Sequence, residues 1–174
     1  MNIVLKAIQY ATSKHEGQVR KVSKEPYITH PIAASYLLAS YKANSKRFPE
    51  LLAAMILHDV LEDTNTTFEE LVSEFGPFIA TLVYELTNDE ENMKELGKLE
   101  YQKKKMHGMT SYGLTLKLID RLANIQDNPT ESYRQCTLEL LSYVKEVRKL
   151  SSTQLRIMTD IIDEIKTHWS HTAD

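Results

Sequence analysis

Apolar residues recur at helical spacing along almost the whole chain. The first segment shows the pattern, because Ile3, Val4, Ala7, Ile8 and Ala11 fall on one face of a helix. The chain has only five glycines and five prolines in 174 residues, so few positions interrupt a helix. We therefore predict an all-α fold, in the form of a helical bundle.

Length and composition favour one domain over two. Of the 174 residues, 42% are hydrophobic and 26% are charged, which is enough for one sizeable core but not for two comfortable ones. No internal repeat, low-complexity tract or linker marks a boundary. We expect a single compact domain over residues 1–174.

The charge balance limits the class of partner. A net charge of −3 and a pI near 6.1 provide no general attraction for nucleic acid or anionic lipid, so we expect a small-molecule substrate and neither nucleic acid nor a membrane as partner. The single cysteine, Cys136, cannot form an internal disulfide, and residues 1–10 lack the apolar core of a signal peptide. These features predict a soluble, cytoplasmic protein.

Local signals place several helix ends. Pro49 suits the first turn of a helix, and the apolar residues after it predict a helix that continues to Asp63. The remaining signals predict a helix from Pro31 to Tyr41, a capping box of Thr66 with Glu69 or Thr67 with Glu70, a stop at Gly76-Pro77, an apolar helix over 78–86, a charged surface helix or mobile connection over 88–105, a loop over 106–112, an apolar helix over 114–125, and packing helices over 131–150 and 154–169, within 130–170.

Four ionisable residues follow the apolar run 52–57. His58, Asp59, Glu62 and Asp63 place one imidazole and three carboxylates within six residues. Such groups are costly at the end of a buried helix without a compensating charge, and a divalent metal ion would supply it. On a continuous helix, Glu62 and Asp63 would lie one turn beyond His58 and Asp59, along one side.

A metal site needs more protein ligands than this pair. His30 stands before a proline at a helix entry, and Asp120 lies within the apolar helix 114–125, where an unpaired carboxylate would be costly. We therefore predict an open site for Mn²⁺, Fe²⁺ or Zn²⁺ whose ligands are His30, His58, Asp59 and Asp120. An open site of this kind activates water and polarises a phosphoryl oxygen, which favours hydrolysis of a phosphoester or phosphoanhydride.

Basic residues near these candidates indicate an anionic substrate. Forked guanidinium groups and ammonium point charges both suit a multiply charged phosphate. The cations that precede His30 or flank Asp120 are Lys14, Arg20, Lys21, Lys117 and Arg121.

Each candidate also has an ordinary structural explanation. A histidine before a proline, such as His30, is more often a capping or turn residue. Asp120 and Arg121 suit a structural ion pair, Lys117 suits a surface residue with a buried stem, and Asn124 suits a hydrogen bond at a helix end. The metal-site interpretation therefore depends on the whole set of residues.

Five ordered motifs lie between residues 7 and 127. They are Lys14-His15 and Gly17-Gln18 leading to Arg20-Lys21; Pro26-Tyr27-Ile28-Thr29-His30-Pro31; His58-Asp59-Val60-Leu61-Glu62-Asp63-Thr64; the Phe75-Gly76 turn with Leu86-Thr87; and Leu116-Lys117-Leu118-Ile119-Asp120-Arg121-Leu122-Ala123-Asn124. This series resembles the HD-domain hydrolases of the RelA/SpoT type, in particular the small stand-alone alarmone hydrolases.

The resemblance implies an HD-domain helical bundle and a manganese-dependent enzyme of the stringent response. Such an enzyme removes pyrophosphate from the 3′ position of guanosine tetra- or pentaphosphate (ppGpp or pppGpp) and leaves GDP or GTP. By the same resemblance the metal ligands are His30, His58, Asp59 and Asp120, the catalytic residues that handle the water or the leaving oxygen are Glu62 and Asp63, and the substrate contacts are Arg20, Lys21, Lys117 and Asn124.

Two departures from the family pattern leave the nucleotide base open. Val22-Ser23-Lys24 replaces a small turn, and Ala123 replaces an aromatic residue or a histidine. An HD phosphohydrolase acting on another nucleotide is the alternative enzyme. A non-catalytic nucleotide-sensing module is a further alternative, although a closed structural metal site would not need Glu62 and Asp63. The sequence does not indicate the oligomeric state.

Overall fold

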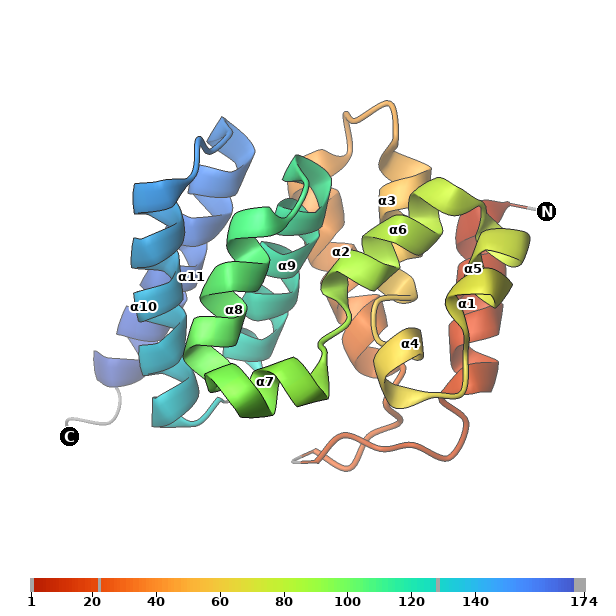
Figure 1. Cartoon of the computed structure of the whole chain (residues 1–174), viewed down its shortest axis with the longest axis horizontal. Coiled ribbons are helices and arrows are strands. Elements are labelled where there is room, and N and C mark those ends of the chain that lie inside the picture. The colour runs from red at the N-terminus through yellow and green to blue at the C-terminus, as the bar shows by residue number, and fades with distance from the viewer. Residues whose placement is uncertain (1, 22, 128, 171–174) are drawn as a thin grey trace. The chain divides into compact units, whose positions relative to one another are not determined.

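The computed structural model describes residues 2–21, 23–127 and 129–170. These residues form eleven α-helices and one isolated antiparallel β-bridge, between Val19 and Pro26 (Figure 1). The prediction of an all-α fold is therefore confirmed. Contacts between Cα atoms divide the chain into two compact units, Met1–Asn88 and Asp89–Asp174.

The first unit is built around an almost completely apolar helix. Its elements are α1 (Ile3–Lys14), α2 (Thr29–Lys42), α3 (Phe48–Ile56), α4 (Val60–Asp63), α5 (Phe68–Phe75) and α6 (Pro77–Leu86). Helix α3 packs against α1, α2 and α6, and Leu51 and Met55 on it are fully buried. A helix that is apolar on all sides is stable only when other elements surround it.

The predicted helix over 49–63 is wrong, because it is broken between α3 and α4. Helix α3 ends at Ile56, and α4 begins at Val60. The ring Nδ1 of His58 lies 2.8 Å from the backbone oxygen of Met55, which in a continuous helix would accept from the N–H of Asp59. The histidine side chain thus replaces a backbone donor and ends the helix.

The short helix α5 has the capping box formed by the second of the two predicted pairs. The hydroxyl of Thr67 accepts the N–H of Glu70 at 3.1 Å, and the Glu70 carboxylate accepts in return from the Thr67 backbone. The helix ends at Gly76, whose φ of 81° and ψ of 162° are accessible almost only to glycine. The predicted stop at Gly76-Pro77 is confirmed, and Pro77 opens α6.

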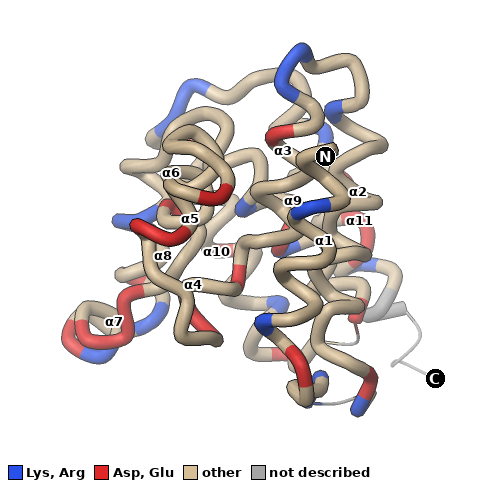
Figure 2. The backbone as a smooth tube through the Cα atoms, turned by 90° about the vertical axis from the view of Figure 1, so that its right-hand side faces the viewer, with Lys and Arg blue, Asp and Glu red and all other residues tan. Residues whose placement is uncertain are grey.

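The second unit contains α7 (Glu90–Leu96), α8 (Lys98–Gly108), α9 (Ser111–Gln126), α10 (Glu131–Val147) and α11 (Ser152–Ser170). Helix α9 is buried along most of its length and packs against α11, while α10 packs against α8. The charged segment forms two helices separated by Gly97, which has a φ of 79°. Helix α7 contains both acidic and basic residues (Figure 2). The predicted loop over 106–112 is shorter than expected, because α8 continues to Gly108.

Among the described residues, no helix combines the length and the apolar character that a membrane span requires.

Candidate active site

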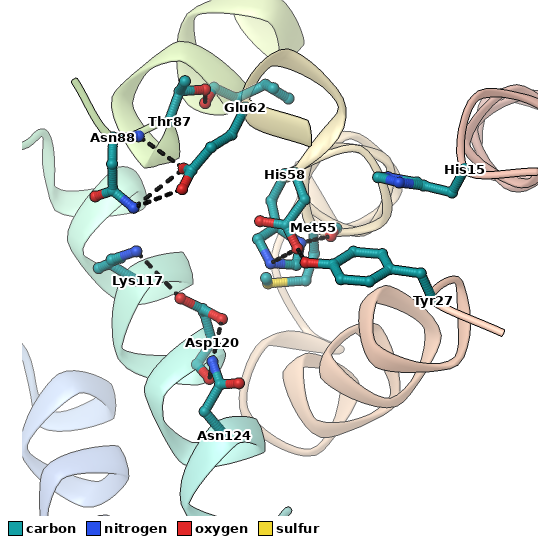
Figure 3. A network of polar contacts seen from close by, with 12 residues as sticks. His15, Tyr27, Met55, His58, Glu62, Thr87, Asn88, Lys117, Asp120 and Asn124 are labelled. Carbon is teal, nitrogen blue, oxygen red and sulfur yellow. Dashed lines mark hydrogen bonds and ion pairs between the residues drawn. The ribbon is translucent and has the colours of Figure 1, made fainter. Parts of the chain in front are cut away.

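The hydrogen bond to the Met55 carbonyl, at the end of α3, fixes which nitrogen of the His58 ring carries a proton. A carbonyl oxygen only accepts, so the Nδ1 atom that faces Met55 carries the proton. In the neutral ring, Nε2 therefore keeps its lone pair, and it lies 3.0 Å from Oδ2 of Asp59. The His58 side chain is 2% exposed (Figure 3), so this contact between an imidazole nitrogen and a carboxylate oxygen lies largely away from solvent.

The Tyr27 phenol holds the carboxylate of Asp59. Its hydroxyl donates to Oδ2 of Asp59 at 2.8 Å. Burial raises the pKa of the Tyr27 phenol far above its usual value, and the negative charges of Asp59 and Asp63 raise it further. Tyr27 therefore remains a protonated donor over the whole ordinary pH range.

His30 lies in the first turn of α2 and is buried. The centroid of its ring is 5.2 Å from that of His58 and 6.4 Å from that of Tyr27. Within the first unit, the structure thus brings together three of the predicted metal ligands, namely His30, His58 and Asp59.

Glu62 is exposed on α4, but its carboxylate has a fixed partner. The backbone N–H of Asn88 donates to Oε2 at 2.8 Å, and the Asn88 side chain donates to Oε2 at 3.0 Å and to Oε1 at 3.1 Å (Figure 3). Asn88 follows the end of α6. A carboxylate that accepts from one rigidly placed residue has a defined orientation toward solvent.

The backbone of Asp63, at the end of α4, is anchored by the side chain of Gln18, which is itself held by His15. Nε2 of Gln18 donates to the Asp63 carbonyl at 2.7 Å, and Oε1 of Gln18 lies 2.8 Å from Nδ1 of His15. His15 is 3% exposed. Its ring stacks on Tyr27, with centroids 4.8 Å apart and an interplanar angle of 31°.

The two predicted cations Arg20 and Lys21 lie on a small hairpin. The N–H of Arg20 donates to the carbonyl of Glu25 at 2.8 Å, and the Arg20 guanidinium lies 5.8 Å from the centroid of the Tyr27 ring. Lys21 is exposed. Lys24 adopts a left-handed φ of 63° and donates from Nζ to the Lys21 carbonyl at 2.7 Å. The Val22 position of the predicted departure lies outside the described residues.

In the second unit, Asp120 is buried on α9 between two donors from the same helix. Nζ of Lys117 lies 3.1 Å from Oδ2 of Asp120, and Nδ2 of Asn124 donates to Oδ1 at 2.8 Å and to the Asp120 carbonyl at 3.0 Å (Figure 3). Spacings of three and four residues place these side chains on one face of the helix. Burial of both charged groups costs free energy. Hydrogen bonds to the donors and acceptors of the pair are needed to offset that cost.

The position of Arg121 next to Asp120 in the sequence suggested a contact with phosphate, but its side chain contacts another helix. Its guanidinium donates to the hydroxyl of Thr137 at 3.0 Å and lies 5.5 Å from the centroid of the Tyr133 ring. Both partners belong to α10, so Arg121 joins α9 to α10 and is not a proposed substrate contact.

The sequence alone assigned no role to four residues of this arrangement: His15, Gln18, Tyr27 and Asn88. The first three stood only within motifs that carried the resemblance. Asn88 directly follows the Leu86-Thr87 motif, but an asparagine after a helix is an ordinary turn residue. No periodicity or spacing links position 88 to Glu62.

A family model and several known proteins are similar to this chain. The family model of the HD domain matches residues 7–150. The guanosine-3′,5′-bis(diphosphate) 3′-pyrophosphohydrolase MESH1 of Xenopus tropicalis is 35% identical over 141 residues, which cover 79% of this chain and 73% of that protein. The bifunctional (p)ppGpp synthase/hydrolase SpoT of Escherichia coli K12 is 42% identical over 95 residues, which cover 55% of this chain but only 12% of SpoT.

A solved structure gives the same relationship. It is described as a metazoan ortholog of SpoT that hydrolyses ppGpp, and it is 28% identical to this chain with a TM-score of 0.78. The match covers 94% of this chain and 96% of that one. The chain therefore belongs to the HD-domain family and is homologous to the stand-alone ppGpp hydrolases of the MESH1 type.

Proposed function

We propose that the chain hydrolyses the 3′-pyrophosphate of ppGpp and pppGpp, with release of pyrophosphate and of GDP or GTP. Homology to MESH1-type hydrolases over most of the chain supports the substrate class. The observation that carries the proposal is the short helix α4, which follows the His58–Asp59 pair directly and presents Glu62 and Asp63 within one turn of it.

We also propose that His30, His58, Asp59 and Asp120 hold a divalent metal, with Mn²⁺ favoured by the family resemblance. The donors of the first unit fit such an ion, because Nε2 of His58 lies 3.0 Å from Oδ2 of Asp59. Two ligand atoms at about 2.1 Å from one ion and at right angles are about 3.0 Å apart. When bound, a divalent ion polarises the phosphoryl oxygen and the attacking water.

Asp120 suits this ligand set for a reason of its own. It is a buried carboxylate that Lys117 contacts at one oxygen and Asn124 at the other. A buried negative charge is favoured by a cation beside it. A metal ligand that is itself held by hydrogen bonds is the usual arrangement at such sites.

Glu62 and Asp63 are the proposed catalytic residues. Hydrolysis breaks the bond between the ribose 3′-oxygen and phosphorus, so the attacking water loses a proton and the leaving 3′-oxygen gains one. A positioned carboxylate can perform either transfer. Glu62 suits this role because it is exposed and yet oriented by Asn88.

The proposed substrate contacts remain Arg20, Lys21, Lys117 and Asn124. The Arg20 guanidinium beside Tyr27 can bind phosphate or stack on a base, and Lys21 is exposed on the same hairpin. The Lys117 ammonium has three donors, of which the bond to Asp120 uses one.

We further propose that the two compact units work as the single HD-type domain that the sequence predicts, because the family model spans residues of both. A cytoplasmic location is part of the proposal, since a chain with one cysteine needs no oxidising compartment.

The test measures pyrophosphate and orthophosphate released from guanosine and adenosine 3′- and 5′-polyphosphates, with Mn²⁺ or with a chelator present. We expect pyrophosphate from ppGpp and pppGpp, only with the metal. His58→Ala and Asp59→Ala should abolish both turnover and Mn²⁺ binding, whereas His107→Ala, at an exposed position of α8, should change neither.

Two results would contradict the proposal. Turnover confined to another nucleotide would establish the alternative HD phosphohydrolase. Nucleotide binding without any turnover, combined with His58→Ala and Asp59→Ala variants that lose only stability, would establish a sensing module.

A further inference from the structure

We propose that His15 is a positioning residue that fixes both ends of helix α4, through Tyr27 at Asp59 and through Gln18 at Asp63. This inference rests on the proposed function, because α4 and the residue before it provide the proposed ligand and catalytic carboxylates.

The first connection, which we call one arm, is the chain of hydrogen bonds from His15 through Gln18 to Asp63. Only one assignment of its donors and acceptors is consistent. The Asp63 carbonyl only accepts, so the Gln18 atom that faces it at 2.7 Å is the amide nitrogen. The Gln18 oxygen therefore faces His15, and the His15 nitrogen at 2.8 Å must carry the proton on Nδ1. His15 thereby sets the orientation of the amide that holds the end of α4.

The other arm runs from His15 through the stacked ring of Tyr27 to Asp59. The face of His15 lies 4.8 Å from that of Tyr27, centroid to centroid, and the Tyr27 hydroxyl donates to Asp59 at 2.8 Å. The stack limits the directions in which Tyr27 can point, and hence where Asp59 receives its hydrogen bond. The contacts of this buried histidine with Gln18 and with Tyr27, which is labelled with it in Figure 3, thus lead to the two ends of one helix.

Helix α4 requires such support because it is one turn long. It contains four residues, and the residue before it, Asp59, forms no side-chain cap. Forming a first helical turn costs more conformational freedom than its few hydrogen bonds return. The position of its carboxylates therefore depends on contacts made by other elements.

The buried state of His15 has an energetic cost of its own. The side chain is 3% exposed, and its Nε2 atom has no hydrogen-bond partner among the described atoms. A buried polar atom without a partner is unfavourable. An apolar ring would avoid this cost and would retain the stack, so the donor at Nδ1 is the property that distinguishes histidine here.

The test separates the two arms with two substitutions at one position. His15→Phe keeps a ring for Tyr27 and loses the donor to Gln18, whereas His15→Asn keeps a donor at the position of Nδ1 and loses the ring. The matched control is His107→Asn, at an exposed histidine. For each variant we would measure kcat and KM for ppGpp, the affinity for Mn²⁺ by calorimetry, and the unfolding temperature.

The expected pattern differs between the two substitutions. His15→Asn should weaken Mn²⁺ binding about tenfold, because residues that orient a ligand typically account for 10- to 100-fold of metal affinity or activity. His15→Phe should retain Mn²⁺ affinity and lower kcat about tenfold at unchanged KM, because only the carboxylate end of α4 is released. His107→Asn should match the wild type in all three measurements.

Tyr27→Phe and Gln18→Met test the same arms without altering the buried histidine, in case its variants fail to fold. Tyr27→Phe should reproduce the loss of metal affinity, and Gln18→Met should reproduce the loss of kcat. The inference is overturned if folded variants at positions 15, 18 and 27 all keep wild-type kcat and Mn²⁺ affinity.

The experiment also distinguishes failure of this inference from failure of the proposed function. If the wild type binds Mn²⁺ but releases no pyrophosphate, the proposed function fails, while weaker Mn²⁺ binding in His15→Asn and Tyr27→Phe would still support the positioning role. If the wild type hydrolyses ppGpp and the variants are unaffected, only the positioning role fails.

Discussion

The carboxylate of Glu62 accepts hydrogen bonds from both the backbone and the side chain of Asn88. The backbone bond is 2.8 Å long, and the side-chain bonds are 3.0 and 3.1 Å long. The two residues are 26 positions apart, and Asn88 is the last residue of the first compact unit. An exposed carboxylate that would otherwise sample several rotamers thus has a defined direction.

Asn88→Ala should lower kcat for ppGpp by about 10- to 100-fold with little change in KM, because a misplaced catalytic group affects the transition state more than substrate binding. Asn88→Asp should have the larger effect, since a second carboxylate repels Glu62. Steady-state kinetics on purified variants measures both. Asn65→Ala, at an exposed asparagine just after α4, is the control, and equal kinetics for Asn88→Ala and Asn65→Ala would contradict the role of Asn88.

Adding Mn²⁺ should stabilise the folded chain. At about 100 times its dissociation constant, a ligand that binds only the native state adds about 2.7 kcal/mol to the free energy of unfolding. Asp120→Ala should lose most of this increment, and a chelator should remove it from the wild type. Denaturant unfolding with and without Mn²⁺ checks this, with Asp163→Asn, at an exposed carboxylate of α11, as control. An unchanged increment in Asp120→Ala would remove Asp120 from the proposed ligands.

Lys117→Met should destabilise the metal-free chain by about 3 kcal/mol, because it leaves a buried carboxylate without its ion-pair partner. Added Mn²⁺ should recover part of this loss, since a cation on Asp120 supplies the missing charge. The control is Lys166→Met, which breaks an exposed pair with Asp163 at 3.7 Å and should cost less than about 0.5 kcal/mol. Equal losses in Lys117→Met and Lys166→Met would show that the buried pair contributes nothing beyond a surface pair.

Stability should decline at alkaline pH in a way that depends on Tyr133. Burial raises the pKa of its phenol to about 12, although the nearby Arg121 guanidinium opposes the shift. An unfolded tyrosine ionises near pH 10, so between pH 10 and 12 the unfolded state binds fewer protons than the folded state. One such group lowers the free energy of unfolding by about 1.4 kcal/mol per pH unit in this window and has no effect below it.

Tyr133→Phe should therefore flatten the alkaline decline, and Tyr84→Phe, at a tyrosine that is 64% exposed, should leave its slope unchanged. Denaturant unfolding at pH 9, 10, 11 and 12 compares the three proteins. Parallel curves for wild type and Tyr133→Phe would contradict the burial-driven shift.

The sequence was sufficient to predict the all-α fold and most of the helices. The apolar spacing and the scarcity of glycine and proline predicted an all-α chain, and the capping residues placed α5 correctly. It also selected His30, His58 and Asp59, which the structure places together within the first unit. These predictions succeeded because they depend on local patterns of burial and charge.

The errors arose where a side chain competes with the backbone or where contacts are distant in sequence. The helix expected over 49–63 is broken by the bond from His58 to Met55, which helical periodicity cannot reveal. The contacts of His15 with Tyr27, and of Asn88 with Glu62, join segments that only the tertiary structure brings together. Arg121 was considered for phosphate because it adjoins Asp120, but adjacent residues on a helix point about 100° apart.

The bond between His58 and the Met55 carbonyl ends α3 and also places a ring proton on Nδ1, so that Nε2 is the nitrogen proposed to bind the metal. One proton therefore links the end of the helix to the proposed metal coordination. A substitution that removed this proton would let the helix continue through Asp59 and would change the direction of its carboxylate. At this position the local fold and the proposed metal binding can change only together.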